Sequence, residues 1–230
     1  MSRELEGRVV VIAGAAGGLG PIVARRLADA GARLVLTDVD QSKLDAVVAQ
    51  LGGEHDARVV DLLDEGGTRA WAESLERVDA VVHLVGGWRG GQAIDKAPLD
   101  DWHLLHNLLI RTLQHTSRAF APALKTSDHG RFVLVSAAAA SKPTSTNAAY
   151  AAAKAAAEAW TLALADELAD HGATANIVVV NAILTPQMRE ESPDKSFRTF
   201  TTAEDIAEGI AYVLSDKAAK MNGKRLALHP

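Results

Sequence analysis

The chain has 230 residues, a formal net charge of -5 and no cysteine. This length predicts one domain, residues 1–230, with a substantial core, and the negative charge argues against nucleic-acid or anionic membrane partners. The missing cysteines exclude disulfides, thiolate nucleophiles and cysteine-ligated zinc, and they suit a reducing compartment. Because the first residues also lack a signal-peptide pattern, we expect a cytoplasmic protein that does not enter a membrane.

Short apolar runs alternate with longer helical patterns along the chain. Strands are predicted at 8–13, 33–37, 57–60, 80–85, 131–136, 175–180 and 225–228, and helices at 18–30, 42–51, 65–76, 101–124, 147–171 and 203–214. Nearly unbroken apolar strands that alternate with helices predict an α/β fold. The expected architecture is a doubly wound parallel sheet, a three-layer Rossmann fold, whose ligands bind beyond the carboxyl ends of the strands.

The first predicted strand is followed by "GAAGGLG", which contains Gly14, Gly18 and Gly20, and then by a helix. Glycines allow a sharp turn and a close approach of the backbone to a phosphate, and the helix start offers free N–H groups. A glycine cluster alone is a weak signal, but its place between the first strand and a helix is typical of dinucleotide binding.

Two acidic residues end the next two strands. Asp38 lies 18 residues after Gly20, a spacing typical of a carboxylate that binds the adenosine ribose, and no Arg or Lys immediately follows it. This favours NAD(H) over NADP(H), although a solvated Asp at a strand end is the alternative. Asp61 could accept a hydrogen bond from the adenine amino group or serve as a helix N-cap.

The segment "YAAAK" places Tyr150 and Lys154 on one face of a helix. An ammonium group beside a phenol favours the phenolate, so the pair predicts a Tyr with a lowered pKa that exchanges a proton with a substrate. A Tyr and a Lys at this spacing are common on exposed helices, and the glycine loop is what favours the functional reading.

With these motifs together, the sequence resembles the short-chain dehydrogenase/reductase family over essentially the whole chain. The matching positions are Gly14, Gly18, Leu19, Gly20, Asn107, Tyr150, Lys154 and Thr185. The resemblance implies that Tyr150 is the general acid/base and that Lys154 binds the nicotinamide ribose and tunes Tyr150. It further implies that Asn107 holds a water in a proton relay and that Thr185 contacts the nicotinamide carboxamide.

Three segments depart from the family pattern. The family's Asn-Asn-Ala-Gly reads His-Leu-Val-Gly here, ending at Gly86, which keeps the family's cofactor-binding glycine, and its Pro-Gly is replaced by Val180 and Asn181. The position of the catalytic serine, thirteen residues before the Tyr, holds Ala137. Ser136 precedes it, and in a strand a shift by one residue turns the side chain to the other face. Ser136 therefore replaces the serine only if the strand is bulged.

These departures resemble the dihydropteridine reductase-like members of the family, which lack the serine, keep the Tyr and Lys, use NADH and carry a Gly-Gly-Trp. The resemblance implies a planar substrate such as a quinonoid dihydropterin, with Trp88 as an aromatic wall. A Trp88 that only packs on its loop is the alternative. The polar segment 187–202 is expected to be a lid over the pocket or a plain surface loop.

Two other functions remain open. One is a general alcohol or ketone dehydrogenase, including a 3-oxoacyl reductase, that uses Ser136. The other is a dinucleotide-binding sensor or scaffold without catalysis. His103 and His106 are three residues apart on a helix but have no convergent further ligand, so no metal site is predicted. The family's long helices pair between subunits, which implies a homodimer or homotetramer.

Overall fold

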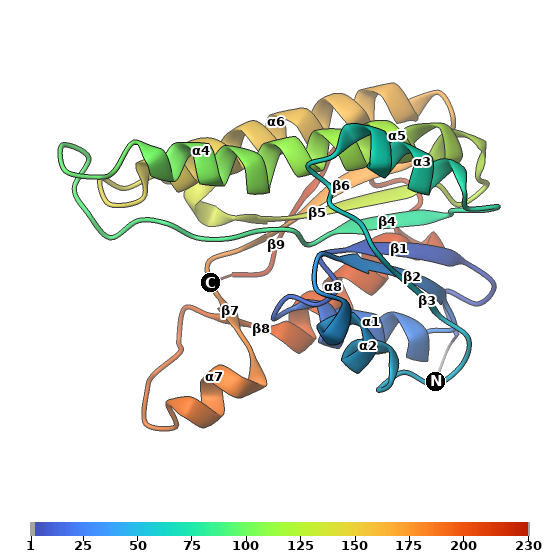
Figure 1. The fold of residues 1–230 in the computed structure, drawn as a ribbon, viewed down its shortest axis with the longest axis horizontal. Coiled ribbons are helices and arrows are strands. Elements are labelled where there is room, and N and C mark those ends of the chain that lie inside the picture. Colours follow the sequence, from blue (N-terminus) through green and yellow to red (C-terminus); the bar gives the residue numbers. More distant parts are fainter. Residues whose placement is uncertain (1–2, 230) are drawn as a thin grey trace.

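The computed structural model describes residues 3–229 and shows the expected parallel sheet. Seven strands form it in the order β3-β2-β1-β4-β5-β6-β9 (Figure 1). The strands are β1 Val9–Ala13, β2 Arg33–Asp38, β3 Asp56–Val59, β4 Ala80–His83, β5 Arg131–Ala137, β6 Thr174–Val180 and β9 Arg225–Ala227. The order runs outward from β1 in both directions, so the predicted doubly wound α/β fold is confirmed.

Helices cover both faces of this sheet (Figure 1). One face carries α1 Gly20–Asp29, α2 Gln41–Val48 and α8 Ala203–Leu214, and the other carries α3 Glu65–Glu73, α4 Asp100–His106, α5 Thr112–Thr126 and α6 Ala148–Ala169. In the described part of the chain, no helix is long and apolar enough to cross a membrane.

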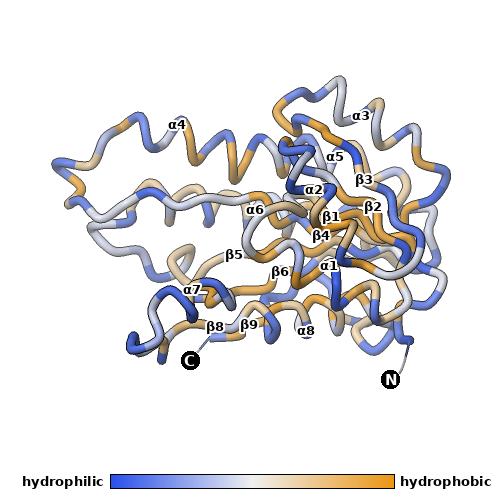
Figure 2. The backbone as a smooth tube through the Cα atoms, turned by 60° about the horizontal axis from the view of Figure 1, so that its bottom comes forward, coloured by the Kyte–Doolittle hydropathy of each residue, from blue (hydrophilic) through white to orange (hydrophobic). Residues whose placement is uncertain are grey.

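The unbroken apolar runs of the strands arise because both faces of the sheet are buried. In β1, Val10 and Ile12 pack against α1 and α8, whereas Val11 and Ala13 belong to the cluster beneath α3, α5 and α6. Figure 2 shows the central strands in hydrophobic colours along their length. Complete burial of a Val or Ile side chain stabilises the fold by about 1.5–3 kcal/mol, so the run fixes β1 at the centre of the sheet.

The predicted continuous helix over 101–124 is interrupted. A π-helical turn over Asn107–Arg111 separates α4 from α5, and the N–H of Thr112 donates to the carbonyl of Asn107. A π-helical turn contains one more residue than an α-helical turn. The side chains that precede it are therefore rotated about the helix axis relative to those that follow it. Sequence periodicity assumes a regular helix and therefore misplaces the side chains before the turn.

The segment 187–202 is more ordered than a plain loop. It begins in α7 Pro186–Glu191, and two short parallel strands, β7 Ile183–Leu184 and β8 Thr201–Thr202, join its two ends. Figure 1 shows α7 projecting from the body of the molecule beside the carboxyl ends of the strands. The pairing of these two strands closes the base of this segment.

Candidate active site

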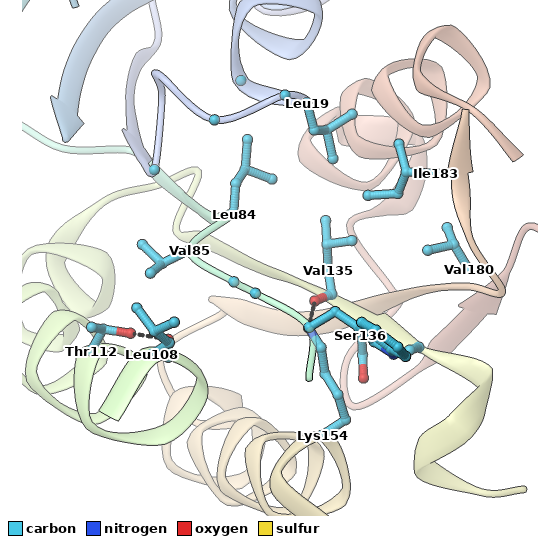
Figure 3. Close-up of a pocket in the computed structure, with 18 of the residues that line it drawn as sticks. Leu19, Leu84, Val85, Leu108, Thr112, Val135, Ser136, Lys154, Val180 and Ile183 are labelled. Carbon is cyan, nitrogen blue, oxygen red and sulfur yellow. Dashed lines mark hydrogen bonds between the residues drawn. The ribbon is translucent and has the colours of Figure 1, made fainter. Parts of the chain in front are cut away.

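A cavity of about 1410 Å³ opens at the carboxyl ends of the strands. Figure 3 shows its walls, which come from the segments that follow β1, β4, β5 and β6. Every residue predicted for the site lines this cavity, with the exception of Asn107; those present are Gly14, Gly18, Leu19, Gly20, Asp38, Asp61, Gly86, Trp88, Ser136, Tyr150, Lys154 and Thr185. Residues from across the sequence thus meet at the edge of the sheet where ligands of such folds bind.

The glycine loop is shaped by two residues that tolerate no side chain. Gly14 has a φ of +83°, and a Cβ there would lie 2.9 Å from the backbone nitrogen of Val85. A Cβ on Gly20 would overlap the backbone of Ala15, so the first turn of α1 packs directly on the loop. The resulting cradle brings backbone N–H groups and the start of α1 to the cavity, which suits the pyrophosphate of a dinucleotide.

Asp38 holds the same loop in place. Its carboxylate accepts one hydrogen bond from the N–H of Ala16 at 3.0 Å and another from the N–H of Val39 at 2.8 Å. The side chain therefore bridges the end of β2 to the glycine loop while it also lines the cavity. Sequence spacing indicated the position of Asp38 but gave no sign of this bridging role.

Two further charged groups lie at this end of the cavity. Asp61 accepts a hydrogen bond from the N–H of Leu63 at 2.9 Å in a tight turn. The N-cap position of α3 belongs to Asp64, so the helix-cap alternative for Asp61 is wrong. Lys43 also lines the cavity, and its ammonium lies 3.2 Å from the carboxylate of Asp40. The sequence pattern did not indicate Lys43, because this residue comes five positions after Asp38, within α2.

At the opposite end, α6 presents Tyr150 and Lys154 to the cavity. The Nζ of Lys154 donates to the carbonyl oxygen of Val135 at 2.9 Å (Figure 3). It lies 6.0 Å from the centre of the Tyr150 ring. Burial lowers the pKa of Lys154 to about 8, while the charge of Glu158 acts in the opposite direction. The lysine therefore titrates near the physiological range, which is typical of functional sites.

The expected lowering of the Tyr150 pKa is wrong for the chain alone. Burial raises the pKa of Tyr150 to about 12. The ammonium of Lys154 is anchored on the Val135 carbonyl, and desolvation of the phenolate is what raises the Tyr150 pKa. Tyr150 is therefore a neutral phenol near neutral pH, a form that can donate a proton to a substrate.

Ser136 is directed away from the position that a catalytic serine would need. The register between β5 and β6 is regular through Ser136 and Ala137, without a bulge. The Ser136 hydroxyl donates to Glu158 on α6 at 2.7 Å, and in Figure 3 it is directed toward the helix that carries Lys154. The condition under which Ser136 could replace the family serine is therefore not met.

Asn107, the first residue of the π-helical turn, does not line the cavity. Its side chain is exposed, and from this region Leu108 and Thr112 line the cavity instead. Thr112 donates to the Leu108 carbonyl and lies 3.3 Å from a ring nitrogen of the buried His83. Burial, aided by the charge of Lys154, lowers the pKa of His83 to about 3, so this ring is neutral near pH 7.

The remaining walls combine apolar and aromatic groups from the segment 187–202 and the loop after β4. Trp88 lines the cavity with 56% of its surface exposed, and the same ring packs over Gly90. Met188 and Phe200 contribute from the segment 187–202. The hydroxyl of Thr185 caps α7 by accepting a hydrogen bond from the N–H of Met188 at 3.2 Å. Trp88 thus both packs on its loop and faces the cavity.

Comparison with known proteins agrees with this arrangement. Residues 8–196 match the family model of the short chain dehydrogenases. Dehydrogenase/reductase SDR family member 6 of Xenopus laevis is 26% identical over 96% of this chain and 95% of its own length. The 3-oxoacyl-[acyl-carrier-protein] reductase FabG of Escherichia coli is 25% identical, with 97% and 96% covered.

Solved structures share the fold at lower identity. An NAD⁺-bound xylitol dehydrogenase superposes with a TM-score of 0.88 at 22% identity, covering 98% of this chain and 99% of that one. A gluconate 5-dehydrogenase of Burkholderia cenocepacia in complex with NADP and tartrate gives 0.86 at 23% identity, covering 98% and 95%. The family match spans most of the chain, and the protein belongs to the short chain dehydrogenase family of oxidoreductases.

Proposed function

We propose that the protein is an NAD(H)-dependent oxidoreductase that transfers hydride between nicotinamide and a small, planar organic substrate. The observation that carries this proposal is the pairing of Tyr150 and Lys154 at one end of a cavity whose other end is the glycine cradle. A site that only bound a dinucleotide would not require a partly buried phenol beside a buried ammonium.

The residues present fit a nicotinamide dinucleotide. The cradle around Gly14 and Gly20 and the start of α1 would receive the pyrophosphate, and Asp38 would face the adenosine ribose, with Gly86 and Thr185 near the nicotinamide half. When bound, the nicotinamide supplies or accepts the hydride. The protein's own contribution is to exclude water, orient both reactants and hold the proton on the Tyr150 hydroxyl.

For the substrate we propose a quinonoid dihydropterin or a similar conjugated imine. Ala137 occupies the position of the family's catalytic serine, and the Ser136 hydroxyl donates its hydrogen bond to Glu158. A carbonyl substrate would lack that second hydrogen bond, whereas a conjugated imine accepts hydride readily without it. In the balanced reaction, the quinonoid dihydropterin takes hydride from NADH and one proton through Tyr150, giving tetrahydropterin and NAD⁺.

The substrate proposal is tested by steady-state kinetics with NADH and freshly generated quinonoid dihydropterin. We expect NADH oxidation well above the uncatalysed rate, with Trp88→Ala raising KM because a flat ring loses its aromatic wall. Turnover of simple ketones or 3-oxoacyl esters combined with no pterin-dependent oxidation would favour the alternative, a general carbonyl reductase.

Replacing Ser136 by Ala separates these substrate classes. Because the hydroxyl donates to Glu158 and not to the cavity, we expect kcat to stay within about tenfold of the unchanged protein. A loss of about a hundredfold or more would show that Ser136 touches the substrate and would contradict the proposal. Circular dichroism of the variant shows whether any loss reflects the fold.

Replacing Asp38 by Ala tests the preference for NAD(H). The Asp38 carboxylate would repel a 2′-phosphate, while Lys43 lies near enough to the same end of the cavity to attract one after the carboxylate is removed. We expect the ratio of kcat/KM for NADH over NADPH to fall by about tenfold or more. The double variant Asp38→Ala with Lys43→Met should recover part of the ratio; no change in either variant would contradict the assignment.

The assembly and location complete the proposal. We expect a homodimer or homotetramer that acts in the cytoplasm, as the family resemblance and the cysteine-free composition suggest. A sensor or scaffold without catalysis is the remaining alternative. It would be favoured by calorimetric binding of NADH together with no turnover on pterins, imines or carbonyls.

A further inference from the structure

A buried carboxylate lies behind the Tyr150–Lys154 pair, on the same helix. Glu158 follows Lys154 by four residues in α6, so the two side chains share one helix face, and both are 7% exposed. Its Oε2 lies 3.0 Å from Nε of Arg225 in β9, and its Oε1 accepts the hydroxyl of Ser136. A buried ion with this many partners is fixed in place.

The surroundings of Lys154 show why this charge matters. Near pH 7, His83 on β4 is neutral and Tyr150 is a neutral phenol. Within residues 3–229, the ammonium of Lys154 donates a hydrogen bond to the Val135 carbonyl on β5. Arg225 faces Glu158 from the far side and is partly exposed to solvent. Among the described groups that act on the charge of Lys154, Glu158 is therefore the one that favours the ammonium.

We propose that Glu158 is a positioning residue for catalysis, whose buried carboxylate, anchored by Arg225 and Ser136, keeps the Lys154 ammonium protonated inside the active site. The role of Lys154 itself rests on the proposed function. In this arrangement Ser136 does not act on the substrate; it donates to Glu158 and helps to hold the carboxylate in place.

The direct test is a pH titration of Lys154 followed by NMR of the ¹³Cε resonance in lysine-labelled protein, assigned by its loss in Lys154→Arg. Glu158→Gln keeps the shape and removes the charge, and we expect the midpoint of Lys154 to fall by about one pH unit. The alkaline limb of kcat/KM should move in the same direction, while Glu158→Asp, which keeps the charge, should restore most of the midpoint.

Glu167→Gln is the matched control on the same helix. Glu167 pairs with Lys125 at 2.5 Å and is exposed, so its loss should leave the Lys154 midpoint unchanged. Should Glu158→Gln fail to fold, Glu158→Met, which replaces the ion by apolar volume, carries the same expectation. An unshifted midpoint in a folded Glu158 variant overturns the proposal. If no pterin, imine or carbonyl substrate were turned over, the proposed function would be wrong, but the titration of Lys154 would still test the role of Glu158.

Discussion

Replacing Tyr150 by Phe is expected to lower kcat/KM for NADH-dependent reduction by about 10²–10⁴-fold, the usual contribution of a positioned general acid. The hydroxyl is the group that hands a proton to the substrate, and its neutral form dominates because burial raises the pKa of Tyr150 to about 12. The ring remains in the variant, so Kd for NADH should change by less than about threefold. Stopped-flow absorbance and calorimetry measure the two quantities separately.

The other tyrosine of the chain provides the control. Tyr212 lies on α8, is 40% exposed and does not line the cavity. Tyr212→Phe should therefore retain the kinetics of the unchanged protein. Retention of activity by Tyr150→Phe, or an equal loss in both variants, would contradict the assignment of the proton donor.

Replacing Lys154 by Met is expected to abolish most activity and yet stabilise the fold. Burial lowers the pKa of Lys154 from 10.5 to about 8, so the folded protein disfavours the ammonium relative to the unfolded chain. Between these two values the unfolded chain binds more protons, and stability rises with pH. Below about pH 8, Lys154 is charged in both states, and the full free-energy cost of burying its ammonium is present. Lys154→Met removes this cost but also loses the hydrogen bond to Val135. The net result should be a free energy of unfolding at pH 7 that is higher by about 2 kcal/mol.

Thermal unfolding measures this effect. A gain of about 2 kcal/mol corresponds to a rise in Tm of about 4–8 °C for a domain of this size. Lys142→Met is the matched control, because Lys142 is exposed and lies outside the cavity, and it should shift stability by less than about 0.5 kcal/mol. A lower Tm for Lys154→Met would show that the ammonium stabilises the fold.

The sheet, its order of elements and most of the site follow from local sequence patterns. Strands such as β1, buried on both faces, leave an unbroken apolar run, and the glycine loop is fixed by steric limits at Gly14 and Gly20. Residues at the carboxyl ends of parallel strands necessarily meet at one edge. This is why residues as distant in sequence as Asp38 and Tyr150 could be placed in one cavity.

What sequence patterns missed depends on non-local geometry. The π-helical turn that begins at the exposed Asn107 leaves no periodic signal, because one additional residue in a turn cannot be detected by counting sequence spacing. The short strands β7 and β8 acquire their pairing only from each other. The network of Ser136, Glu158 and Arg225 joins β5, α6 and β9. The burial that raises the Tyr150 pKa likewise exists only in the folded chain.

The most direct test of the account follows the hydride itself. Purified protein is incubated with NADH deuterated at the transferred position and with quinonoid dihydropterin, imine and carbonyl substrates in separate reactions, and each product is analysed by mass spectrometry. The account predicts NAD⁺ that has lost the deuterium, formed in equal amount with tetrahydropterin and strongly reduced in Tyr150→Phe; deuterium delivered to a pterin nitrogen then exchanges with water. Binding of NADH without formation of NAD⁺ in any of the reactions would contradict it and would leave a protein that binds the dinucleotide without oxidising it.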